Sequence, residues 1–127
     1  LEWARDNRTT GIRVPLSSNS ARRVENRIAG MDCNPYLGIA VSLACGYLGI
    51  KNEIRPSKQF RGDAYEGAED IPRGLRSALD LFEEATPLHK ILGTEFCRVY
   101  SIVKRAEHDE FLQVISPWER EHLLLNV

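Results

Sequence analysis

Two short segments near the N-terminus have the hydrophobic and polar pattern of β-strands. Residues 11–16 carry β-branched side chains and lead into a run of serines and an asparagine that is typical of a loop. Residues 22–28 alternate between two faces, with Val24 and Ile28 on one face and three charged residues on the other. Because the connecting loop is short, we expect an antiparallel hairpin whose apolar face meets the helices of the fold.

After the hairpin, the apolar positions recur with helical spacing. The expected helices run from Pro35 to about Gly49, from near Pro72 past Phe82, from Thr86 to Gly93, from Phe96 to about Val114, and from Pro117 onward. Asn34 and Ser116 precede two of these segments as N-cap residues, and residues 51–70 are polar and rich in turn formers. The sequence therefore predicts an α+β fold, in which an antiparallel β-hairpin is followed by four or five helices.

Composition narrows the class of protein. The length of 127 residues predicts one domain, and 43% hydrophobic with 28% charged residues is ordinary for a globular chain. A net charge of -1 argues against nucleic acid or an anionic membrane as a partner, and the longest uncharged run, residues 34–50, is shorter than the ~20 residues of a membrane span.

The three cysteines lack zinc-site spacing, which favours reduced thiols and a cytoplasmic location. Met31 is the only methionine, so we expect a fragment of a longer chain.

The charged face of the second strand is the strongest candidate for a functional site. Arg23, Glu25 and Arg27 are spaced two residues apart, so they form one row about 13 Å long at ~3.4 Å per residue. Guanidinium groups beside a carboxylate suit a phosphorylated ligand and its metal ion, and Arg8 and Arg13 add positive charge nearby. A solvated strand face with Arg–Glu ion pairs explains the same spacing. One glutamate cannot supply all the oxygen ligands that Mg²⁺ requires.

Three linked motifs relate this hairpin to a known family. They are Asn-Arg at 7–8 followed by Arg-Val-Pro at 13–15, Ala-Arg-Arg-Val-Glu-Asn-Arg at 21–27, and Asn-Pro-Tyr at 34–36. In this order and spacing they resemble the C-terminal signature of the glutamine synthetase family, closely over residues 7–50 and loosely to the end. The NRTT variant and the closing SPWEREHLLLNV resemble the γ-glutamylputrescine synthetase branch. The resemblance implies that residues 1–127 are the C-terminal part of the family's catalytic domain, with the hairpin in its catalytic barrel.

The resemblance also implies roles for five charged residues in and before the hairpin. Arg8 is expected to bind nucleotide phosphates and the acyl phosphate, and Arg13 is expected to contact ATP. Arg23 is expected to bind phosphate, and Glu25 to ligate the metal ion that bridges the phosphates. Arg27 is expected to hold the glutamate carboxylate and the transferring phosphoryl group. The implied catalytic residues are thus Arg8 and Arg27, and the implied cofactors are ATP and Mg²⁺ or Mn²⁺.

The implied reaction is ATP-dependent ligation, in which ATP phosphorylates the γ-carboxylate of glutamate and an amine displaces the phosphate. Putrescine is the amine expected from the branch resemblance. Ammonia-using glutamine synthetase and a non-catalytic structural member of the family are the alternatives, and the net charge disfavours an arginine-rich RNA-binding module. Further active-site residues are expected from the rest of the chain and from neighbouring subunits of a ring-like homo-oligomer, so the fragment alone is expected to be inactive.

Overall fold

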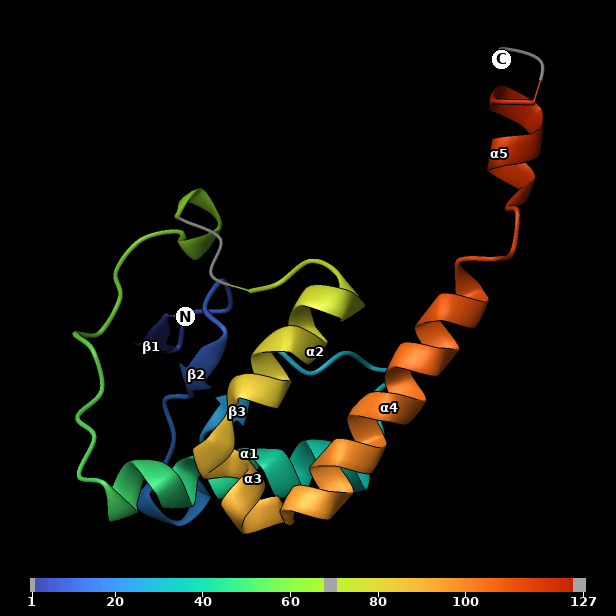
Figure 1. The fold of residues 1–127 in the computed structure, drawn as a ribbon. Coiled ribbons are helices and arrows are strands. Elements are labelled where there is room, and N and C mark those ends of the chain that lie inside the picture. The colour runs from blue at the N-terminus through green and yellow to red at the C-terminus, as the bar shows by residue number, and fades with distance from the viewer. Residues whose placement is uncertain (1, 68–70, 125–127) are drawn as a thin grey trace. The chain divides into compact units, whose positions relative to one another are not determined.

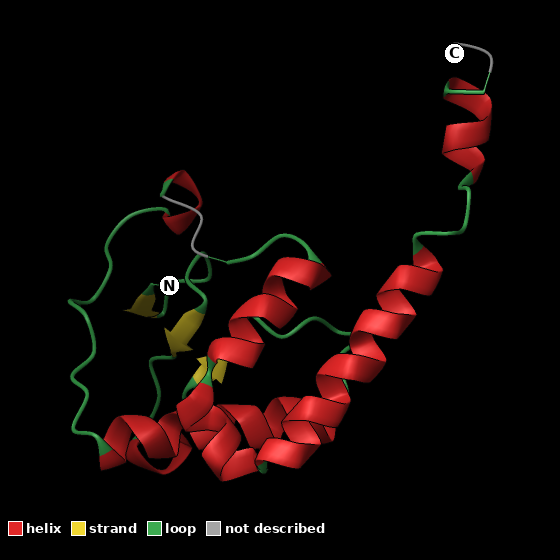
Figure 2. Ribbon diagram, viewed as in Figure 1, coloured by secondary structure: helices red, strands yellow, loops and turns green. Residues whose placement is uncertain are grey.

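The structure, a computed structural model, describes residues 2–67 and 71–124 (Figure 1). The chain divides into two units, residues 1–72 and residues 73–127. The N-terminal unit contains a small sheet and one long helix, and the C-terminal unit is helical (Figure 2). The fold is therefore of the predicted α+β class, with five α-helices among the described residues. No helix within the two described ranges is long and apolar enough to cross a membrane.

Three short strands form the sheet of the N-terminal unit, in the order β1-β2-β3. β1 (Trp3–Arg5) and β2 (Ile12–Val14) run parallel, and β3 (Glu25–Asn26) pairs antiparallel with β2. The antiparallel pair is the predicted hairpin, and its register places Arg13 opposite Glu25. Opposed residues on neighbouring antiparallel strands have Cβ atoms about 4.5–5.5 Å apart, so this register brings an arginine beside a carboxylate.

The sheet differs from the sequence prediction in two respects. β1 is not predicted, because its parallel pairing with β2 crosses a short turn, whereas parallel strands normally need a connection of a dozen or more residues. β3 covers two residues rather than the whole of 22–28, and on the side of Arg23 the reason is that Pro15 has no N–H with which to extend the β2 ladder. The expectation that Val24 and Ile28 face the helices is wrong, since both side chains are exposed.

Helix α1 (Pro35–Lys51) begins as predicted. The Asn34 side chain accepts hydrogen bonds from the backbone N–H groups of Tyr36 and Leu37 at 3.0 and 3.3 Å, and the proline occupies the first turn, where no N–H is needed. The helix is apolar on all sides, yet only Ala44 is buried. An apolar helix of this kind is normally covered by other elements.

The long loop predicted after α1 is present, and it is tied to the sheet. The Trp3 indole N–H donates to the Ser57 carbonyl at 2.7 Å, and the Phe60 N–H donates to the Trp3 carbonyl at 3.0 Å. Two short 3₁₀ turns complete the N-terminal unit, η1 (Asn19–Ala21) and η2 (Ala64–Glu66). The loop after α1 is therefore hydrogen-bonded to β1, although the two segments are far apart in sequence.

The described part of the C-terminal unit consists of four helices. They are α2 (Leu75–Glu84), α3 (Thr86–Leu92), α4 (Thr94–Phe111) and α5 (Pro117–His122). Gly93 separates α3 from α4 with a φ of 97°, in the left-handed region that favours glycine. Ser116 and Glu119 form the predicted capping box at the start of α5. All four helices match predicted segments to within a few residues.

The core of this unit lies where α2 and α3 pack against α4. Leu79 of α2 and Cys97 and Ser101 of α4 are buried. The ring of Phe82 meets the ring of Tyr100 edge-on, with centroids 5.8 Å apart. Burial raises the pKa of the Cys97 thiol, so this cysteine stays protonated and has a packing role.

Candidate functional site

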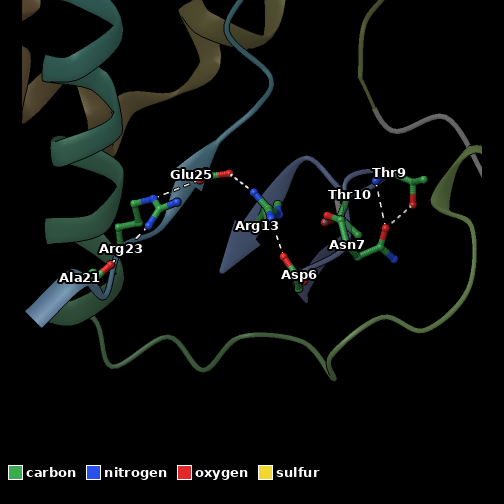
Figure 3. Close-up of polar contacts among 8 residues, drawn as sticks. All are labelled: Asp6, Asn7, Thr9, Thr10, Arg13, Ala21, Arg23 and Glu25. Atoms are coloured by element: carbon green, nitrogen blue, oxygen red, sulfur yellow. Dashed lines mark hydrogen bonds and ion pairs between the residues drawn. The ribbon is translucent and has the colours of Figure 1, made fainter. Parts of the chain in front are cut away.

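The turn between β1 and β2 carries Arg8 and is stiffened by its own side chains (Figure 3). Asn7 Oδ1 accepts hydrogen bonds from the Thr9 N–H at 2.9 Å and from the Thr9 hydroxyl at 2.8 Å. Thr10 is buried, and its hydroxyl lies 3.1 Å from the Asn7 carbonyl and 3.0 Å from the Ile12 carbonyl. Asparagine and threonine readily form such side-chain-to-backbone bonds, so the sequence N-R-T-T shapes a turn from which Arg8 is exposed.

The loop after α1 forms hydrogen bonds with the same turn. Asn7 Nδ2 donates to the Gly62 carbonyl at 2.9 Å, and the Ala64 N–H donates to the Thr9 hydroxyl at 2.9 Å. In each pair the partners are 55 residues apart in sequence. The backbone that carries Arg8 is therefore fixed by tertiary contacts as well as by local ones.

Four charged side chains form a continuous ion-pair row across the sheet (Figure 3). Arg13 Nη1 donates to Glu25 Oε2 at 2.9 Å, and Arg13 Nη2 donates to the carboxylate of Asp6. The other carboxylate oxygen of Glu25 accepts a hydrogen bond from Arg23 Nε at 3.1 Å. Of the predicted row of Arg23, Glu25 and Arg27, the structure brings Arg23 and Glu25 into contact, and Arg27 takes no part in the ion pairs.

The two arginines of this row favour the ionised form of Glu25. A hydrogen bond from Arg13, reinforced by one from Arg23, lowers the pKa of Glu25 below its ordinary value. Hydrogen bonds to Asp6 and to Glu25 raise the pKa of Arg13 in turn. Glu25 is therefore ionised at neutral pH, and 27% of its side chain is exposed. An ionised and accessible carboxylate is an oxygen donor of the kind that Mg²⁺ and Mn²⁺ prefer.

Arg8 and Arg27 lie outside this row. Both side chains are exposed, and neither forms an ion pair or a side-chain hydrogen bond with the residues that the structure describes. The backbone of Arg27 is nevertheless anchored, because its N–H donates to the Gly11 carbonyl at 2.8 Å. An exposed guanidinium that no carboxylate occupies can offer all its donors to a phosphate or a carboxylate ligand.

The described residues fit a metal ion only in part. Glu25 has the charge and the exposure of a ligand, but residues 2–67 and 71–124 contain no group of three or more His, Cys, Asp or Glu side chains that could hold a metal. Mg²⁺ requires near-octahedral oxygen coordination. A cation at Glu25 would take its other ligands from water, from a bound phosphate or from a further part of the protein.

Comparison with known proteins identifies the family. The family profile described as glutamine synthetase, catalytic domain, matches residues 1–123. The chain belongs to the glutamine synthetase family. The predicted fold is also confirmed, because a solved structure described as apo GmaS without ligand matches with a TM-score of 0.83 at 29% identity, over 98% of this chain and 30% of that one.

Two of its relatives within the family are named for different amines, and others are glutamine synthetases. Glutamate–isopropylamine ligase of a Pseudomonas species is 38% identical over 92% of this chain, and γ-glutamylputrescine synthetase PuuA of Escherichia coli K12 is 36% identical over 98%. Glutamine synthetase of Methanocaldococcus jannaschii is 34% identical over 98%. The chain spans 26%, 26% and 30% of the lengths of these three relatives. The polyamine branch is therefore one member of a group of similar relatives and is not singled out.

Two residues of the site escape the sequence prediction. Asp6 is not among the predicted site residues, because its partner Arg13 becomes a neighbour only through the unpredicted pairing of β1 with β2. Thr10 reads as an ordinary polar turn residue, although it is buried. The available signal was the asparagine two residues before a threonine in N-R-T-T, which is typical of side-chain-supported turns.

Proposed function

We propose that this chain is the C-terminal part of the catalytic domain of an ATP-dependent ligase that joins an amine to the γ-carboxylate of glutamate. The observation that carries the proposal is the contact of Arg13 and Arg23 with the two oxygens of Glu25, on strands whose neighbouring segments carry Arg8 and Arg27, both without an ion pair among the described residues. Family membership supports the ligase class, since the named relatives are ligases or synthetases.

Each charged residue has a part in the proposed chemistry. Arg8, Arg13 and Arg23 bind the phosphates of ATP, because a guanidinium keeps its charge and binds two oxygens in a fixed geometry. Glu25 helps to hold a divalent cation, which when bound neutralises charge on the phosphates. Arg27 binds glutamate and stabilises the charge that develops on the transferring phosphoryl group.

The proposed reaction has two steps. An oxygen of the glutamate γ-carboxylate attacks the γ-phosphorus of ATP, and ADP leaves, which yields γ-glutamyl phosphate. The nitrogen of the amine then attacks the acyl carbon, inorganic phosphate leaves, and the nitrogen loses a proton to give the amide. In both steps Arg27 is proposed to contact an oxygen that carries negative charge, so its positive charge lowers the activation barrier of each step.

The exposed face of α1 supports a larger assembly. Four large apolar side chains lie along one side of this helix and are 54–83% exposed: Tyr36, Ile39, Leu43 and Tyr47. Contiguous apolar faces of this kind are normally covered by protein. We assign the covering surface to the rest of the catalytic domain, and we expect neighbouring subunits of a ring-like homo-oligomer to complete the active site.

The amine is proposed to be a primary alkylamine such as putrescine. The NRTT turn and the SPWEREHLLLNV segment support this choice, as do the relatives named for putrescine and isopropylamine. Ammonia is the second candidate, because glutamine synthetases match with similar identity. A non-catalytic family member is the third, and the presence of Arg8, Arg23, Glu25 and Arg27 disfavours it, since a structural protein does not need these charged residues.

Phosphate release by the full-length enzyme tests the proposal. The enzyme is supplied with glutamate, ATP and Mg²⁺, and with putrescine, isopropylamine or ammonium at equal concentration. We expect an alkylamine to exceed ammonium by tenfold or more in kcat/KM, which corresponds to about 1.4 kcal/mol. A tenfold preference for ammonium would replace the proposal with a glutamine synthetase, and no release with any amine would favour the non-catalytic alternative.

A further inference from the structure

Asp6 has a strained backbone and a defined partner. It follows β1 and has a φ of 49°, in the left-handed region where aspartate and asparagine are tolerated better than most residues. Its N–H donates to the Val14 carbonyl at 3.0 Å, which holds the residue against the end of β2. From this position its carboxylate accepts a hydrogen bond from Arg13 Nη2.

Arg13 is thereby held from two sides. Its Nη1 donates to Glu25 and its Nη2 to Asp6, and only 13% of its side chain is exposed. The guanidinium is a planar fork, so fixing both terminal nitrogens fixes the plane of the group. Arg13 Nε is buried and has no hydrogen-bond partner in the described structure, so no hydrogen bond at that atom opposes a rotation of the fork.

The orientation of Arg13 determines how much of Glu25 it occupies. A carboxylate offers about four lone-pair sites, and Arg13 and Arg23 each use one, on different oxygens. If Asp6 released Nη2, the guanidinium of Arg13 could turn and bind Glu25 through both nitrogens. Fewer sites on Glu25 would then remain for a cation, and Arg13 would no longer face a phosphate.

We infer that Asp6 is a positioning residue, which holds Arg13 in the orientation that nucleotide and metal binding require. This inference rests on the proposed function, since it concerns the same hairpin. The positioning role and the change in charge predict opposite effects of an Asp6 substitution on nucleotide affinity. The ion-pair row contains two carboxylates and two arginines, so removing the charge of Asp6 makes the row more positive and would by itself strengthen the binding of an anion.

The test compares Asp6→Asn with Asp109→Asn in the full-length enzyme. Asparagine keeps the size of the side chain and the tolerance for positive φ, so the first change removes the charge and replaces one acceptor oxygen with an NH2 donor that cannot bind Arg13. Asp109 is the matched control, because it pairs with Arg76 at 3.3 Å within the C-terminal unit. Calorimetry measures the Kd of a non-hydrolysable ATP analogue with Mg²⁺, and steady-state kinetics separate the KM for ATP from kcat.

We expect Asp6→Asn to weaken nucleotide binding about tenfold and to raise the KM for ATP in parallel, with kcat changed less than threefold. The control should bind within twofold of wild type. If Asp6→Asn does not fold, Asp6→Gly keeps the positive φ without a side chain and should show the same weakening.

Binding by Asp6→Asn that equals or exceeds that of wild type would overturn the positioning role. Failure of the ligase proposal can be distinguished from failure of the positioning role. A wild-type enzyme that binds the nucleotide but releases no phosphate with any amine contradicts the ligase, while the comparison of Kd values still decides the role of Asp6. A wild-type enzyme that binds no nucleotide contradicts both.

Discussion

Replacing Thr10 with valine tests whether a buried hydroxyl stiffens the turn that carries Arg8. Thr10 is 2% exposed, and its hydroxyl lies within hydrogen-bond distance of two backbone carbonyls. Valine keeps the shape and the β-branch but removes the donor. A neutral hydrogen bond contributes about 0.5–1.5 kcal/mol, and a buried acceptor left unsatisfied costs about 1–3 kcal/mol. Because one hydroxyl hydrogen serves both carbonyls, we expect a local loss of about 1–3 kcal/mol.

Amide hydrogen exchange on the full-length protein measures this loss where it arises. A loss of about 1–3 kcal/mol corresponds to exchange that is about 5–140 times faster, since about 1.4 kcal/mol is a factor of ten. The amides of Thr9, Ile12 and Arg27 report it, because all three donate hydrogen bonds in or beside the turn. Thr86→Val is the control, since Thr86 is exposed and its hydroxyl lies 3.4 Å from its carbonyl partner. Exchange in Thr10→Val within twofold of wild type would refute the reasoning.

Three further predictions concern other parts of the fold, each measured by unfolding of the full-length protein. Leu79→Ala should lower the free energy of unfolding by about 2–5 kcal/mol, because Leu79 is 3% exposed, whereas Leu81→Ala on the same helix should change it little; equal effects would contradict the assigned core. Asn34→Ala should cost about 1 kcal/mol through loss of the α1 cap and Asn34→Asp should cost less, so similar losses would argue against capping. Folding lowers the pKa of Glu25 from 4.5, so its ion pairs stabilise the protein above pH 4.5 and this contribution is lost as the pH falls through the lower folded value. Glu25→Gln should therefore have a shallower acid decline of Tm than wild type, and parallel curves would exclude the pair as a cause.

Local chemistry accounts for the parts of the fold that the sequence predicts well. Asn34 and Ser116 cap the helices that follow them through bonds to residues two or three positions away, so these helix starts are visible in the sequence. The contact between Arg23 and Glu25 is equally local, because alternate residues of an extended strand share a face.

Non-local pairing accounts for the parts that could not be predicted. Asp6 meets Arg13 only because β1 runs parallel to β2. A strand of three residues is too short for its hydrophobic pattern to be recognised in the sequence. Val24 was placed toward the helices by alternation alone, but the ladder does not reach it and the side chain is exposed. The further ligands that the proposed cation at Glu25 requires are likewise not found among the described residues, so no pattern in these segments could have predicted them.

The most direct test of the account is trapping of the acyl phosphate. Full-length wild-type enzyme, glutamate, ATP and Mg²⁺ with hydroxylamine as the nucleophile should yield γ-glutamyl hydroxamate, whichever amine is the natural substrate. Glu25→Gln should slow its formation by about 10²–10³-fold, the usual effect of losing one group that stabilises transition-state charge. Glu83→Gln, which breaks an ion pair with Arg105 at 2.8 Å in the C-terminal unit, should stay within threefold of wild type. Hydroxamate formation by Glu25→Gln at the rate of wild type would contradict the assignment of this hairpin to the active site.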